Sequence, residues 1–485
     1  MKAEGINIVW LKRDLRTRDH EPLAAAEAAG KPYLILYIFD PDVITHPDTS
    51  ERHLRFQYRS LVTMNDSIPA KNPAIQIFYG NTTAVFTWLF EKYSVENLYS
   101  YRESGVQKTF DIDRKIARLC QAKSVVWTEF QRDGILRGIK NRENWDKNWF
   151  TRMESPVVIN TFTPEKILSC NHPFPLPESF SNAWSLVNEH EQPPGEKNGW
   201  QYLRSFMEER GKNYSRHISK PLQSRLSCTR LSPYLAWGNL SIRQVYQTLT
   251  RTEQPPGQKR AVMNAVTRLK WHCHFIQKFE TRCDYESRCI NPAFEHVWNR
   301  PDDSFLTAWK TGNTGYPLVD ANMRCVIQTG WINFRMRAML VSFLCHHLFL
   351  DWRSGVYHLA RQFLDYEPGI HFTQFQMQAG CTGVNTIRVY NPVKNSLEHD
   401  PEAEFIKKWC PEIAHLPLEY IHQPWLMSDM EQEMYRCRLG NDYPKPVVSL
   451  HAFRDKRELL WSLRKTDVAR EEGKKIVKTL VRPKP

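Results

Sequence analysis

Residues 6–39, INIVWLKRDLRTRDHEPLAAAEAAGKPYLILYIF, decide the fold class of the first part of the chain. Two apolar runs typical of buried strands, at 6–10 and 33–39, flank a helical pattern that ends at Gly30, a residue suited to a helix C-cap. Strand-like segments then follow at 74–80, 96–101 and 124–130. Strands that alternate with helices predict a parallel sheet covered on both faces, here a Rossmann-like α/β domain over residues 1–130.

The rest of the chain has a different character. Residues 131–199 are polar and rich in proline, and we interpret them as an interdomain linker. From Trp200 onward strand patterns nearly vanish, and helical periodicity over 241–250, 259–280 and 331–352 takes their place. The sequence therefore predicts a large all-α domain over residues 200–485.

Composition limits the function classes. The 485 residues carry 66 Lys and Arg against 53 Asp and Glu, a formal net charge of +13. This charge favours an anionic partner, nucleic acid first, although a merely basic enzyme accounts for it equally well. The longest strongly apolar stretch, 338–345, is far shorter than a membrane span of about 20 residues, and the N-terminus lacks the pattern of a secretory signal. We expect a cytoplasmic monomer with no membrane association.

Two cofactor types are disfavoured by the motifs. The 11 cysteines include no C-x-x-C pair, so we expect free thiols and no metal site. The first predicted strand is followed by LKRDLRTRDH and not by G-x-G-x-x-G, so the α/β domain is not expected to bind a dinucleotide. A nicotinamide-dependent oxidoreductase is disfavoured for the same reason.

Five blocks in a fixed order resemble the DNA photolyase/cryptochrome family, bacterial-type members in particular. They are WLKRDLRTRDHEPLAAA (10–26), TRLSPYLAWGNLS (229–241), TGYPLVDANMR (314–324), GWINFRMRAM (330–339) and RVYNPVKNSLEHDPEAEFIKKW (388–409). The resemblance covers nearly the whole chain. It implies an α/β domain, a long linker and a C-terminal all-α FAD-binding domain that holds its cofactor in a bent shape, which is the layout that the residue patterns predict.

The flavin segment begins at Thr229 and Ser232, whose hydroxyls precede a predicted helix with Pro233 in its first turn. Such a helix start suits a pyrophosphate, although an ordinary capped helix shows the same pattern. Arg335 and Arg337 are two residues apart and cannot share a helix face, so we expect one to face flavin and the other the substrate or a carboxylate. The resemblance implies FAD contacts from Tyr214, Thr229, Arg230, Leu231, Ser232, Arg337, Asp365, Glu367 and His371.

The chain departs from the family pattern beside the flavin. Where photolyases usually carry Asp-x-Asp, this chain has Asp365-Tyr366-Glu367. By position, His371 faces flavin N5, where a histidine could donate a hydrogen bond or a proton, or simply pack.

The resemblance also implies that electrons reach excited FAD along three tryptophans. Trp309 and Trp352 match the distal and middle members, whereas the flavin-proximal member aligns with Phe375, and phenylalanine is hard to oxidise. Either another aromatic residue substitutes, or photoreduction is slow. The candidates for a substitute are Tyr366, Tyr390 and Trp331. The implied catalytic residues are Trp309, Trp352, Phe375 and His371.

The substrate pocket differs from both known lesion pockets. Trp271 is retained from the photolyases of cyclobutane dimers, but Arg268 replaces their glutamate and Met377 a second tryptophan. The histidine pair of (6-4) photolyases is absent from Asn333-Phe334. An aromatic cavity still suits a nucleotide flipped out of UV-damaged DNA. Expected DNA contacts are Arg268, Trp271, His272, Phe334, Arg335 and Met377; Lys270, His274 and Lys278 share the helix and could bind phosphates or form a solvated face.

The function implied by these features is that of a deoxyribodipyrimidine photo-lyase, a carbon–carbon lyase that uses blue light and reduced FAD to split pyrimidine dimers. The cyclobutane type is favoured because Trp271 is retained. The alternative is a cryptochrome-type blue-light photoreceptor without repair activity, which the altered pocket and Phe375 favour. A folate-type antenna chromophore would lie near Glu103, although ordinary loop chemistry explains residues 101–111 equally well.

Overall fold

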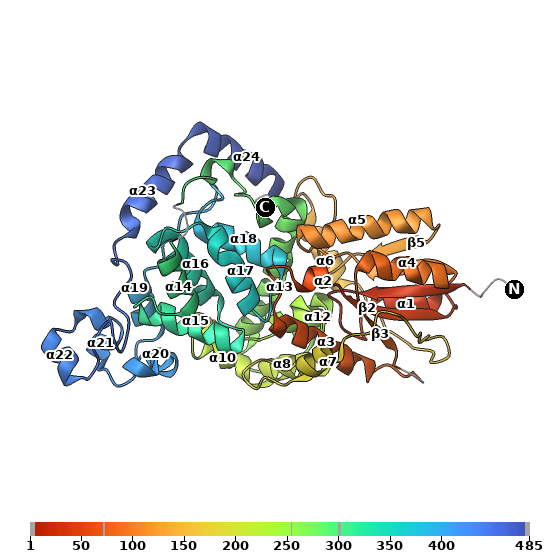
Figure 1. Cartoon of the computed structure of the whole chain (residues 1–485), viewed down its shortest axis with the longest axis horizontal. Helices are drawn as coiled ribbons and strands as arrows, with labels where there is room; N and C mark the ends of the chain where they lie inside the picture. Colours follow the sequence, from red (N-terminus) through yellow and green to blue (C-terminus); the bar gives the residue numbers. More distant parts are fainter. Residues whose placement is uncertain (1–4, 71–72, 254, 299–301, 481–485) are drawn as a thin grey trace.

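The computed structural model describes residues 5–70, 73–253, 255–298 and 302–480. Within these ranges five strands form one parallel sheet in the order β3-β2-β1-β4-β5 (Figure 1). The strands are β1 (Ile6–Leu11), β2 (Tyr33–Phe39), β3 (Ile75–Tyr79), β4 (Val95–Tyr101) and β5 (Val126–Phe130). The parallel pairing confirms the predicted α/β domain.

Helices cover both faces of this sheet. They are α1 (Glu21–Ala28), α2 (Pro41–Ile44), α3 (Glu51–Asn65), α4 (Thr82–Lys92) and α5 (Gln107–Ala122). Because successive strand residues point to opposite faces, Val9 and Ile35 pack with α1 and α3, while Ile8 and Leu34 pack with α4 and α5. Both faces of the strands are therefore buried, which explains their continuous apolar runs.

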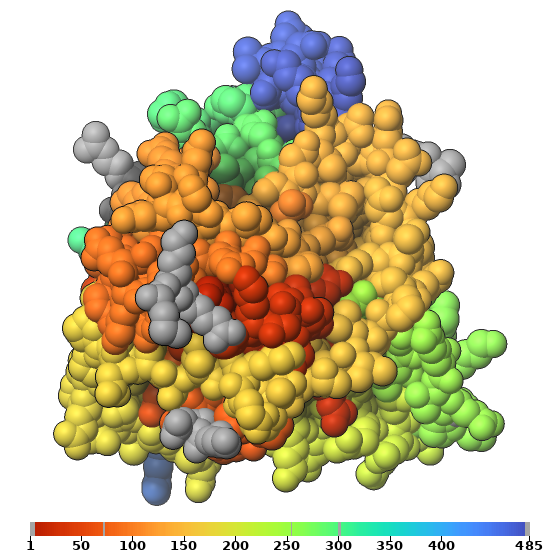
Figure 2. Space-filling model, turned by 90° about the vertical axis from the view of Figure 1, so that its right-hand side faces the viewer, coloured from red at the N-terminus to blue at the C-terminus, as the bar shows by residue number. Residues whose placement is uncertain are grey.

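The connecting segment contains two helices, α6 (Trp145–Glu154) and α7 (Glu178–Ser185). Trp184 of α7 packs into the core beneath α3, and the Tyr33 backbone exchanges hydrogen bonds with Lys166 and Leu168. Figure 2 shows this segment, in yellow, covering the lower part of the α/β domain. Helix α6 instead packs against the helical half, where Trp145 joins that half's core. The segment thus binds both halves together.

The regular elements of the second half are helices in its described residues, as the periodicity predicts, apart from an isolated bridge between Leu439 and Tyr443. Its helices are α8 (Glu196–Glu208), α9 (Tyr214–His217), α10 (Ser224–Ser227), α11 (Ser232–Ala236), α12 (Ile242–Arg251), α13 (Lys259–Thr281), α14 (Asp303–Thr311), α15 (Pro317–Thr329), α16 (Phe334–Ser342), η4 (Phe343–His347), α17 (Trp352–Gln362), α18 (Pro368–Ala379), α19 (Pro392–His399), α20 (Glu404–Trp409), α21 (Leu418–Ile421), α22 (Asp429–Met434), α23 (Phe453–Arg464) and α24 (Asp467–Leu480). None of the described helices is both long and apolar enough to cross a membrane.

The single helix predicted over 331–352 is wrong. Asn333 caps the start of α16 by accepting a hydrogen bond from the Met336 amide, and α16 passes into the π-helical turn η4. A break follows, with Phe349 in the left-handed region at φ 55°, and Asp351 then caps α17. The two side-chain caps start the helices at Phe334 and Trp352, and the backbone turns away between them at Phe349, where apolar periodicity alone predicts a continuous helix. Trp352 is therefore the first residue of a separate helix.

The domains meet at the carboxyl ends of β1 and β4, where the strand order reverses. In α/β folds this crevice is a common ligand site. Here Lys12 Nζ lies 2.6 Å from Asp113 Oδ1, and Arg13 Nη1 donates to the Tyr366 carbonyl at 2.9 Å. The Arg13 guanidinium also lies 4.4 Å from the ring centre of Trp237. Side chains of both domains thus occupy the crevice.

Candidate functional site

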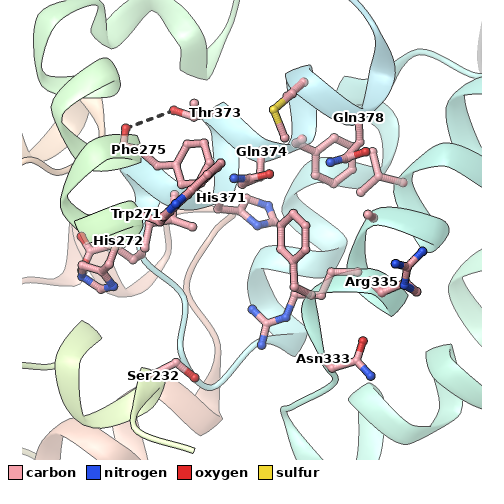
Figure 3. A pocket seen from close by; sticks show the side chains of 18 of the residues that line it. Ser232, Trp271, His272, Phe275, Asn333, Arg335, His371, Thr373, Gln374 and Gln378 are labelled. Atoms are coloured by element: carbon pink, nitrogen blue, oxygen red, sulfur yellow. Dashed lines mark hydrogen bonds between the residues drawn. The ribbon is translucent and has the colours of Figure 1, made fainter. Parts of the chain in front are cut away.

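A cavity of about 820 Å³ lies in the helical half, between α13, α16 and α18 (Figure 3). Its walls include most residues expected from the sequence, whereas Leu231, Trp309 and Trp352 are not among its lining residues. Ile476 and Leu480 of the C-terminal helix α24 complete one wall. The expected residues that line it are Tyr214, Thr229, Arg230, Ser232, Arg268, Trp271, His272, Phe334, Arg335, Arg337, Asp365, Glu367, His371, Phe375 and Met377.

Two carboxylates of the cavity wall are held by arginines. Arg337 Nη2 donates to Asp365 Oδ2 at 2.8 Å, and Arg132 Nη2 donates to Glu367 Oε2 at 3.0 Å. The second oxygens, Asp365 Oδ1 and Glu367 Oε1, are buried and have no hydrogen-bond partner within the described structure. Buried polar atoms are normally satisfied, so these oxygens suit N–H or O–H donors of a bound ligand. The expected split of Arg335 and Arg337 fits this geometry, since only Arg337 pairs with a carboxylate among the described residues.

A cationic corner lies near Thr229 and Ser232. Arg230 is buried at φ 58°, and its guanidinium bonds to Gln192 Oε1 and to the carbonyl of Arg225. Burial and the nearby Arg225 lower the pKa of Arg230 to about 10, which leaves it charged at neutral pH. In the described ranges neither arginine forms an ion pair, and a buried cation without a carboxylate partner favours an anionic ligand.

This corner changes the expected anion site. Helix α11, which was expected to supply a helix N-terminus, has only five residues. The positive charge at this point comes mainly from Arg225 and Arg230. Thr229 and Ser232 remain on the cavity wall with their hydroxyls, as the sequence predicts.

The ring of His371 is fixed by the backbone. Its Nε2 lies 2.8 Å from the Val356 carbonyl, an acceptor only, so Nε2 carries the hydrogen and Nδ1 is the free acceptor. Burial lowers the pKa of His371 to about 4, so the ring is neutral at neutral pH. The expected proton-donor role does not agree with this state. His371 can instead accept a hydrogen bond at Nδ1.

Aromatic residues form the mouth of the cavity. Trp271 of α13 is 47% exposed and Phe334 at the start of α16 is 51% exposed, both large values for such side chains. Trp271 also packs against Phe275, with ring centres 5.5 Å apart. Exposed aromatic faces at a cavity mouth suit stacking with a planar ring. Arg268, also exposed, lies one helical turn before Trp271 on the same wall.

The basic stripe expected along α13 is divided by the fold. Lys270 pairs with Asp146 at 3.1 Å, and His274 Nδ1 accepts a hydrogen bond from Arg142. Neither faces the cavity as a free cation. His272 lines the cavity, and burial lowers its pKa, which keeps the ring neutral. Burial likewise lowers the pKa of Lys278 to about 8. Lys278 therefore remains mostly protonated at neutral pH, and Arg268 is the exposed cation of this helix at the cavity.

Two glutamines of α18 were not identified from the sequence. Gln374 and Gln378 lie four residues apart and both line the cavity (Figure 3). Both amide atoms of Gln374 are buried and have no partner within the described structure. The run TQFQMQ over 373–378 carries this i, i+4 spacing. The pattern could have been noticed, although Gln376 of the same run bonds to backbone carbonyls elsewhere.

The expected electron-transfer residues lie behind the cavity. Trp309 and Trp352 are fully buried, and the Trp309 indole donates to the Leu340 carbonyl at 3.0 Å. Phe375 stands between Trp352, at 6.4 Å between ring centres, and His371, at 5.5 Å. A phenyl ring therefore occupies the step between the second tryptophan and the cavity.

The expected antenna residue is bonded to the α/β domain and to the connecting segment. Glu103 Oε1 lies 3.5 Å from Arg13 Nε, and its carbonyl accepts from Arg137. A separate cavity of about 280 Å³ lies between the starts of α4 and α5 and is lined by Lys108, Arg114, Lys115 and Arg118, among others. An antenna chromophore stays a prediction.

A parallel α/β domain joined to a helical domain with one large cavity, lined by arginines, carboxylates and aromatic rings, defines a two-domain flavoprotein. Residues 265–460 match the family model described as the FAD binding domain of DNA photolyase, and residues 7–141 match the model described as DNA photolyase. The chain belongs to the DNA photolyase/cryptochrome family.

Relatives of both kinds are similar to this chain over nearly its whole length. It is 26% identical to a deoxyribodipyrimidine photo-lyase of Alkalihalophilus pseudofirmus (94% of this chain, 98% of the relative) and 27% identical to a cryptochrome DASH of Synechocystis sp. (92% and 95%). Among solved structures, a Synechocystis cryptochrome superposes with a TM-score of 0.84 at 25% identity (95% and 100%). An archaeal photolyase from Sulfolobus tokodaii, solved with two FAD molecules, gives 0.73 at 25% identity (95% and 99%).

Proposed function

We propose that this protein is a light-driven DNA repair enzyme that splits pyrimidine dimers, the cyclobutane type in particular, in UV-damaged DNA. The observation that carries the proposal is the open aromatic mouth. Trp271 and Phe334, about half exposed, stand at the entrance of the cavity whose depth carries the flavin-type polar groups. A flipped nucleotide needs such a stacking entrance.

The residues present fit FAD. Arg230, buried without a carboxylate partner, would hold its pyrophosphate, with the hydroxyls of Thr229 and Ser232 beside it and the half-buried Arg225 adding positive charge behind. The unpartnered oxygen of Asp365 would accept from an N–H of the ring system. When bound, FAD supplies the light absorption and the electron, and the protein supplies position and electrostatics.

The chain's own side chains would bind and orient DNA at the mouth. Arg268 and Arg335 would contact phosphates on either side of the flipped nucleotide, because phosphate contacts fix register. Trp271 and Phe334 would stack on the dimer, and the flexible Met377 would fill the remaining space. Neutral His272 would pack against the base without adding charge.

The test is a repair assay on the flavin-loaded protein. Oligonucleotides with a single cyclobutane dimer or a single (6-4) product are incubated with it under blue light and in the dark, and restored thymines are counted. We expect light-dependent restoration of thymines from the cyclobutane dimer. Trp271→Ala should lose this activity, whereas the control Phe150→Ala, which removes another exposed aromatic ring, should keep it. Light-driven flavin reduction without restoration of either lesion would instead support a cryptochrome-type photoreceptor.

A further inference from the structure

Tyr366 stands in the segment where this chain departs from the family pattern. Its ring lines the large cavity and lies 5.4 Å from the ring centre of His371. Its hydroxyl donates to Asp48 Oδ2 at 2.7 Å. Asp48 belongs to the loop between α2 and α3, so the phenol reaches from the cavity wall into the other domain. The side chain is 3% exposed, which shields it from solvent.

Asp48 is an ionised carboxylate in direct hydrogen-bond contact with the phenol, so it can take the proton that the strongly acidic oxidised phenol releases. Although burial opposes ionisation, the bond from His46, at 2.6 Å from Asp48 Oδ1, and the bond from Tyr366 hold the pKa of Asp48 below its usual value. His46 is partly exposed and also lies 3.8 Å from Glu286. A buried phenol, a carboxylate and a histidine therefore form a hydrogen-bonded line from the cavity wall to the surface.

We propose that Tyr366 is the electron donor that replaces the missing flavin-proximal tryptophan. Tyr366 would give one electron to the light-excited, oxidised FAD while its O–H bond breaks and a new O–H bond forms on the Asp48 carboxylate. Tyr366 is thereby oxidised by one electron to a neutral radical, and the flavin is reduced by one electron. An external thiol, reacting as its thiolate, then gives one electron to the radical and becomes a thiyl radical, and the proton returns from Asp48 to the phenol oxygen of Tyr366.

The coupled proton transfer makes this position chemically suitable. The Arg13 guanidinium lies 5.8 Å from the Tyr366 ring and would oppose a cationic radical. Because the proton leaves with the electron, the radical is neutral and the cation has little effect on it. His53, stacked on Tyr366 at 5.6 Å, does not compete for the proton, since burial lowers its pKa to about 4 and its Nε2 donates to the Phe363 carbonyl.

The other two candidates lack this arrangement. Trp331 has the Arg230 guanidinium 4.1 Å from its ring centre and that of Arg225 at 5.9 Å, and two cations oppose its oxidation. Tyr390 lines the cavity, but the hydrogen bonds found within the described residues give its hydroxyl no acceptor. On the tryptophan side, Phe375 separates Trp352 from the cavity.

The inference rests on FAD binding and not on DNA repair, so it is tested without DNA. Flavin-loaded protein is illuminated with a thiol present, and the rate of flavin reduction is followed by absorption. We expect Tyr366→Phe, which removes only the hydroxyl, and Asp48→Asn, which cannot take the proton, to lower the rate at least tenfold. The matched control Tyr246→Phe, at a buried tyrosine of α12 that does not line the cavity, should keep the wild-type rate of flavin reduction.

A second readout identifies the radical directly in the unsubstituted chain. Protein is made with ring-deuterated tyrosine or ring-deuterated tryptophan, illuminated without thiol, frozen and examined by electron paramagnetic resonance. We expect only the tyrosine label to narrow the signal of the protein radical. A signal narrowed by the tryptophan label, or an undiminished rate in Tyr366→Phe, would overturn the proposal. If Tyr366→Phe loses flavin, the spectra of the labelled wild-type protein and the reduction rate of Asp48→Asn decide whether Tyr366 is the donor. Failure of repair with these results intact would refute only the proposed function.

Discussion

The pair formed by Arg337 and Asp365 gives a prediction that the structure makes quantitative. Asp365→Asn keeps the shape of the side chain and removes its charge. Breaking a fully buried pair by removing one partner costs about 3–5 kcal/mol. The Arg337 side chain is 25% exposed and keeps its bond to the Ile332 carbonyl and its stacking over Phe363, so it recovers part of this cost. We expect the free energy of unfolding to fall by about 2 kcal/mol, in the range of a hydrogen bond between charged groups.

The assay is urea unfolding of the flavin-free protein followed by tryptophan fluorescence, on Asp365→Asn, Arg337→Gln and the double variant. The double-mutant cycle isolates the interaction of the two side chains. The matched control is Asp284→Asn, which breaks a pair of the same 2.8 Å length whose side chains are 37% and 41% exposed. Exposed pairs contribute about 0–1 kcal/mol. The reasoning would be refuted if Asp365→Asn cost no more than Asp284→Asn.

Three further predictions concern binding and pH. Arg268→Ala should flatten the salt dependence of DNA binding by about one phosphate contact, whereas Lys270→Ala, whose charge is already paired, should leave the slope unchanged; equal slopes in both variants would contradict the assignment. Gln374→Leu should weaken binding of dimer-containing DNA about tenfold, because its amide would no longer hydrogen-bond a base, while the surface control Gln121→Leu should not. The measurement is fluorescence anisotropy at unchanged flavin content, and an unaltered affinity of Gln374→Leu would exclude a hydrogen bond from this amide to a base. Burial lowers the pKa of His346 from 6.5 to about 4 in the folded state. The stability that depends on a neutral His346 is therefore fully present above pH 6.5 and is lost as the pH falls toward 4, by roughly 3 kcal/mol. A urea unfolding midpoint that stays constant over that pH range would contradict this prediction.

Local patterns predicted the architecture because burial leaves a periodic trace in the chain. The strands at 6–10 and 33–39 were recognisable as apolar runs since both of their faces are covered. The error over 331–352 came from reading periodicity and overlooking Asn333 and Asp351, two capping residues that were visible in the sequence. Here a local signal existed and was outweighed by an apolar stretch.

Contacts within the site were less accessible because they join distant parts of the chain. Nothing near Lys270 in the sequence indicates that Asp146 neutralises it. The hydroxyl of Tyr366 meets Asp48 across 318 residues, so a tyrosine that was merely an aromatic candidate acquires a proton acceptor only in the folded protein. The resemblance located the cavity residues, whereas their charge states follow from burial, which the sequence does not show.

The crossing of Arg13 into the helical half has a consequence for how the molecule can be divided. The wall segment 365–367 is held by Arg13, Asp48 and Arg132, and all three lie outside residues 200–485. A helical half produced alone would lack Arg132 and Asp48. The Glu367 carboxylate would then lose its ion-pair partner, and the Tyr366 hydroxyl would lose its hydrogen-bond acceptor. The cavity wall at 365–367 is therefore shared between the helical half and the part of the chain that precedes it. Substitutions on the outer surface of the α/β domain should leave this wall unchanged, whereas substitutions of Arg13, Asp48 or Arg132 reach the cavity through its backbone and side-chain hydrogen bonds.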